Sequence, residues 1–110
     1  MERRNMDRHH VMNAKELRAS AANAEPPPGL SPALAALWHL TRDEWDAAHN
    51  LAQSDHSRDG AWVHAHLHRV EGDLANAGYW YRRADRPPSK APLADEWEEI
   101  ATSLLTAECT

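Results

Sequence analysis

Apolar residues recur at the spacing of an α-helix along the C-terminal part of the chain, and this pattern constrains the fold most. Beyond the proline-containing segment RPPSKAP, six apolar residues occupy positions i, i+4, i+7, i+8, i+11 and i+12: Leu93, Trp97, Ile100, Ala101, Leu104 and Leu105. This spacing gathers them on one face of an amphipathic helix. Leu34, Leu37 and Trp38 show the same helical spacing earlier in the chain. The sequence therefore predicts an all-α fold.

Turn and cap residues divide residues 31 to 108 into short helices. Ser31 followed by Pro32 marks a helix start, because serine caps a helix N-terminus and proline fits the first helical position. Asp43 is expected to cap the second helix, and the pair Gly72-Asp73 to end the third helix and cap the fourth. The pattern predicts a single domain made of two antiparallel helical hairpins and a C-terminal closing helix.

Residues 1 to 30 carry no large apolar stripe, and their last part, EPPPG, is too proline-rich for a helix. We expect a flexible N-terminal arm and a stiff linker there. No stretch approaches the length of about 20 apolar residues that a membrane span needs, and no apolar run suits a signal peptide. These features predict a cytoplasmic protein without membrane partners.

The charge and cysteine content exclude several classes of protein. A formal net charge of −5 argues against general nucleic-acid binding, which normally needs a basic surface. The one cysteine, Cys109, cannot form an internal disulfide, and it excludes a zinc site with four thiolates. A metal site in this chain would have to use histidines and carboxylates.

A shift of thirty residues aligns the two expected hairpins. Four residues then match their counterparts: Ala35 with Ala65, Leu37 with Leu67, Asp43 with Asp73 and Ala47 with Ala77. The segment EGDLANAGYWYRRA, with Gly72, Ala77, Tyr81 and Ala84, resembles the turn and second helix of a tetratricopeptide or Sel1-like repeat. The departures are His68, which stands where such a repeat usually has a large aromatic residue, and Arg42, which replaces the glycine in the first hairpin. Residues 66 to 83 are also similar to a group of uncharacterised bacterial proteins.

The segment HAHLHRVE contains three alternating histidines and a glutamate. At about 100° per residue, His66 falls on the apolar face of the third helix, where we expect a hydrogen-bonded core histidine. His64, His68 and Glu71 fall on an adjoining polar ridge at i, i+4 and i+7. Two histidines four residues apart on one helix can both reach a metal ion, and Glu71 can supply an oxygen ligand. These three residues are candidate ligands for zinc or iron.

Two hypotheses about function follow. The resemblance to helical repeats implies a small binding or scaffolding module whose groove recognises a peptide or protein partner, without a cofactor; a homodimer is compatible with it. The candidate groove residues are His64, His68, Arg69, Glu71, Tyr79, Arg82 and Arg83. The alternative is a metal-binding protein or metal-dependent enzyme that uses His64, His68 and Glu71. Whether the protein is an enzyme stays open. Arg82 and Arg83 also suit the solvated C-terminal end of a helix, where positive charge is favourable.

Overall fold

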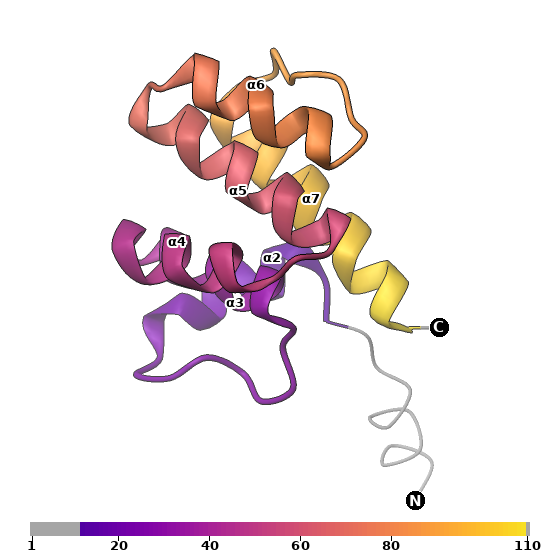
Figure 1. Ribbon diagram of the computed structural model, residues 1–110. Coiled ribbons are helices and arrows are strands. Elements are labelled where there is room, and N and C mark those ends of the chain that lie inside the picture. The colour runs from indigo at the N-terminus through magenta and orange to yellow at the C-terminus, as the bar shows by residue number, and fades with distance from the viewer. Residues whose placement is uncertain (1–11, 110) are drawn as a thin grey trace, which may run out of the picture.

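A computed structural model describes residues 12–109 of the chain, and these residues contain helices but no strand (Figure 1). The all-α prediction is confirmed. The elements in chain order are α2 (Ala14–Ala19), the short 3-10 helix η1 (Ser20–Ala22), α3 (Pro32–Thr41), α4 (Trp45–Ser54), α5 (Arg58–Glu71), α6 (Leu74–Arg83) and α7 (Leu93–Cys109). None of these helices is long and apolar enough to cross a membrane.

The helices form two hairpins and a closing helix, as predicted. Helix α3 packs on α4, and α5 packs on α6. Helix α5 is central, because it also contacts α3, α4 and α7 (Figure 1). Helix α7 closes the domain against α2, α3 and α5. The histidine-rich helix α5 therefore lies between the first hairpin, the closing helix and α6.

Most of the predicted caps are present. The Ser31 hydroxyl accepts a hydrogen bond from the Leu34 amide at 3.2 Å, and Asp73 accepts one from the Asn76 amide at 3.2 Å. Gly72 ends α5 in the left-handed conformation with φ 89°. The predicted cap at Asp43 is wrong: Asp43 itself has φ 65°, and α4 begins one residue later than that prediction requires. Asp43 takes the left-handed position that glycine takes in the second hairpin, and aspartate tolerates this conformation better than most residues.

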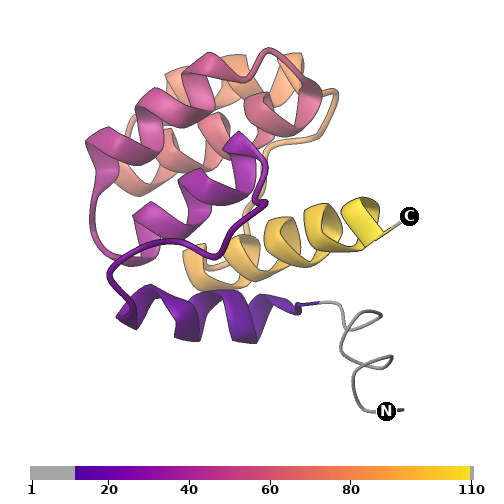
Figure 2. The same cartoon turned by 90° about the horizontal axis from the view of Figure 1, so that it is seen from below.

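The predicted N-terminal boundary is also wrong in part. Helix α2 lies beside α7 (Figure 2), and its Leu17 is fully buried in the core. Arg42 donates hydrogen bonds to the carbonyl oxygens of Ala21 (2.8 Å) and Asn23 (2.6 Å), which fasten the chain after α2 to the first hairpin. The sequence has few apolar residues in this segment. Leu17 nevertheless holds α2 on the domain, because α7 provides a surface that covers it. Residues 1–11 of the expected arm lie outside the described residues.

Tryptophans supply much of the core. Trp38, Trp62 and Trp97 are buried. The indole N–H of Trp97 donates to the carbonyl oxygen of Leu37 at 3.2 Å and joins α7 to α3. Trp45 and Trp80 are only partly buried, and both lie against histidines.

Candidate metal centre

Three histidines meet where α4 packs on α5. His49 comes from α4, and His64 and His68 are one turn apart on α5. Nε2 of His49 lies 3.0 Å from Nε2 of His64. Each of the three residues offers one ring nitrogen, and these nitrogens lie within 4.8 Å of one another. The arrangement brings three potential nitrogen ligands to one point, from both hairpins. We call His49, His64 and His68 the histidine triad.

The triad is covered by neighbouring aromatic rings. His64 and His68 have exposed fractions of only 3 % and 5 %. The Trp80 ring stacks on His64 with a centroid distance of 3.8 Å, and Trp45 stacks on His49 at 4.7 Å. The polar ridge predicted at His64 and His68 is therefore not a solvent-facing surface. Helices α4 and α6 both pack on this side of α5, so positions that would face solvent on an isolated helix are buried here.

Glu71 takes a different position from the one expected. Its carboxylate lies 2.6 Å from Nδ1 of His68, so Glu71 serves as the partner of this imidazole. A carboxylate accepts a hydrogen bond from Nδ1–H, and in the neutral ring this leaves Nε2 of His68 unprotonated and able to bind a metal ion. Ligand histidines in metalloproteins commonly have such a partner on the second nitrogen. Glu71 thus orients the ring of His68, and His49 offers the third nitrogen of the cluster.

The protonation states of His49 and His64 also suit metal binding. Burial, together with the nearby rings of His49 and His68, lowers the pKa of His64 to about 4. Burial and repulsion from His68 lower the pKa of His49, against the opposite effect of Glu71 and Asp46. Neutral imidazole is the form that binds metals, so these two ligands need not release a proton at neutral pH.

One atom of the triad has no partner in the described part of the chain. Nδ1 of His64 is buried and without a hydrogen bond. Since its Nε2 faces Nε2 of His49, a neutral His64 leaves one polar nitrogen unpaired whichever tautomer it adopts. Buried unpaired polar groups cost free energy and are few in native proteins; in the described residues the other such atom is Nε1 of Trp38, in the core.

The other residues predicted to line a groove do not join the triad. Arg69 turns toward α7, where it donates to Glu96 and to the carbonyl oxygen of Ala91, both at 2.7 Å. On α6, Arg83 donates to the Tyr79 hydroxyl at 3.2 Å, and Arg82 is exposed. These residues therefore lie on separate faces of the domain.

His66 is a hydrogen-bonded core histidine, as predicted. Its Nδ1 lies 2.7 Å from Glu96, a buried carboxylate of α7 that also accepts hydrogen bonds from Arg69 and Tyr81. Glu96 was missed in the sequence analysis, although it lies three residues after Leu93 and four before Ile100, at the edge of the apolar face of α7.

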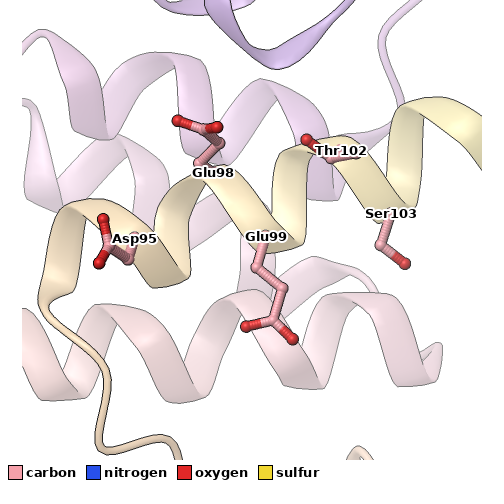
Figure 3. Close-up of a pocket in the computed structure, with 5 residues that line it drawn as sticks. All are labelled: Asp95, Glu98, Glu99, Thr102 and Ser103. Atoms are coloured by element: carbon pink, nitrogen blue, oxygen red, sulfur yellow. The ribbon is translucent and has the colours of Figure 1, made fainter.

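The outer face of α7 carries a polar hollow of about 460 Å³ (Figure 3). Its lining residues are Asp95, Glu98, Glu99, Thr102 and Ser103. The labelled acidic side chains point in different directions and do not converge (Figure 3). This surface is a solvated acidic face, and the histidine triad is the better candidate for a metal centre.

The fold and the triad define a small all-helical protein with a three-histidine cluster between its hairpins. No family model, curated protein or solved structure matches the chain.

Proposed function

We propose that the protein binds a divalent transition-metal ion, zinc in the first place, through the histidine triad. The observation that carries the proposal is the convergence of three ring nitrogens from two helices. Two nitrogens held about 2.0 Å from a tetrahedral zinc lie about 3.3 Å apart. The 3.0 Å between His49 and His64 is close to this value without any ion.

The ligand set favours zinc over iron. Imidazole suits zinc, whereas non-haem iron sites typically combine two histidines with a directly bound carboxylate. Here the nearest carboxylate, Glu71, is engaged with Nδ1 of His68. Three protein ligands leave a fourth tetrahedral position for water or an external ligand.

The position of the triad gives the ion a structural consequence. His49 belongs to the first hairpin, whereas His64 and His68 belong to the second. An ion shared between them cross-links the α4–α5 interface and stabilises the folded state by an amount that rises with its affinity.

The peptide-binding hypothesis receives less support. It used His64 and His68 as groove residues, and both are buried. A partner would have to displace Trp80 or α4 to reach them. Metal binding uses the same two residues without any such rearrangement.

Zinc titration of the untagged full-length chain tests the proposal. After removal of bound metal with a chelator, we expect one zinc ion per chain in calorimetry, and binding weakened at least about a hundredfold in His49→Gln. The control His56→Gln removes an exposed histidine outside the triad and should bind as the unmodified chain does. A second control, His9→Gln/His10→Gln, removes the adjacent histidines near the N-terminus. Failure to bind zinc, or loss of binding in the second control alone, would refute the assignment.

A further inference from the structure

His66 presents a second histidine site, on the side of α5 that faces α7. Its ring is 1 % exposed, and Nδ1 contacts Glu96 at 2.7 Å. Burial opposes ionisation of Glu96, but hydrogen bonds from His66, Tyr81 and Arg69 hold its pKa below the usual value. Glu96 is therefore a carboxylate and can only accept hydrogen bonds. Nδ1 of His66 therefore donates to Glu96, and in the neutral ring Nε2 is the acceptor.

Nε2 of His66 has no hydrogen-bond partner within residues 12–109. His66 lines a groove of about 320 Å³ between α2, α3, α5 and α7. Most of the other lining is apolar: Leu40, Val70, Leu93, Ala94 and Trp97. Val70 and Leu93 have exposed fractions of 38 % and 40 %, which are high for branched aliphatic residues. The groove combines an apolar wall with one oriented acceptor that nothing in the described chain uses.

The charges in the lining are balanced. Arg18 lies over the Trp97 ring at 4.6 Å, and Asp43 contributes one negative charge. One cation and one anion give no net preference for a charged ligand. Recognition must then come from apolar contact and from the acceptor nitrogen.

We propose that this groove binds a small, uncharged apolar molecule with one O–H or N–H donor, such as a phenol or an indole. The apolar body of the ligand packs on Val70, Leu93 and Trp97, and its donor group binds Nε2 of His66. The fixed tautomer makes the site selective, because a molecule of the same shape without a donor leaves this nitrogen unpaired. The site does not include the histidine triad, so the outcome of its test does not depend on the metal proposal.

Nuclear magnetic resonance titration of the full-length chain with p-cresol and toluene tests this site. The two probes have similar shapes, but only p-cresol has a donor. We expect p-cresol to shift the amide resonances of Val70, Leu93 and Ala94, with a dissociation constant about fivefold lower than that of toluene, the value of one neutral hydrogen bond. The ¹⁵N resonance of Nε2 in His66 should move with p-cresol and stay unchanged with toluene.

Two surface variants locate the binding. Val70→Trp fills the groove from a partly exposed position and should abolish the p-cresol response. Leu74→Trp adds the same ring at the exposed start of α6, outside the groove, and should leave the response intact. Equal affinity for the two probes, binding that survives Val70→Trp, or a proton on Nε2 in the free protein would each overturn the proposal.

Discussion

Replacing Glu71 distinguishes an orienting partner of His68 from a metal ligand. Loss of a partner on the second nitrogen of a ligand histidine typically costs about 10- to 100-fold in metal affinity. The Glu71 side chain is 38 % exposed, so water partly replaces it, and glutamine keeps one oxygen as an acceptor. We therefore expect Glu71→Gln to weaken zinc binding by about tenfold, or about 1.4 kcal/mol. Glu71→Ala removes the acceptor altogether, and its loss of zinc affinity should approach about 100-fold.

Competition against a chelator of known affinity, followed by calorimetry, measures these changes and the stoichiometry. Both Glu71 variants should still bind one zinc ion per chain. Glu98→Gln is the matched control, because it makes the same change at an exposed glutamate of α7 outside the triad. If Glu71→Ala abolishes binding as fully as His68→Gln does, Glu71 is a direct ligand. If neither Glu71 variant changes the affinity, the orientation argument is wrong.

Three further predictions concern stability, and urea denaturation measures each of them. Leu17→Ala should cost about 2–5 kcal/mol, because Leu17 is fully buried against the closing helix; a change near zero would return residues 14–22 to a dispensable arm. Ala77→Leu should cost about 1–3 kcal/mol by overpacking the α5–α6 contact, where Ala77 is 2 % exposed, and a neutral result would contradict that packing. Because the pKa of Glu96 is lowered in the folded state, stability should fall as the pH drops below about 4.5, the usual glutamate value. Glu96→Gln should show a weaker dependence on pH in this range, and an unchanged slope would contradict the assignment.

Local sequence signals predicted the helices well. Ser31, Gly72 and Asp73 act through their own backbone neighbours, so their roles can be read without knowledge of the fold. Asp43 was misassigned because two local roles compete at one residue. It can cap a helix with its side chain, or it can adopt positive φ itself. Because the turn between α3 and α4 has no glycine, Asp43 takes the positive φ.

Only part of the candidate site could be predicted, because the rest depends on how the helices pack. His64 and His68 share a helix, so their proximity follows from helical geometry alone. His49 lies 15 residues before His64, on another helix, and its approach depends on how the hairpins pack. The burial of the triad likewise depends on Trp45 and Trp80, which come from the helices on either side.

The two histidine clusters of α5 differ in how their polar groups are paired. In the cluster around Glu96, both carboxylate oxygens are hydrogen-bonded, by His66, Arg69 and Tyr81. This network stabilises the contact between α5 and α7, and it leaves Nε2 of His66 facing the groove. In the triad, His64 keeps an unpaired Nδ1, and its pKa is lowered to about 4. Apolar side chains would pack the α4–α5 interface without these costs. A sequence that keeps three imidazoles at this interface gives up apolar packing there, and such departures are expected where a ligand binds.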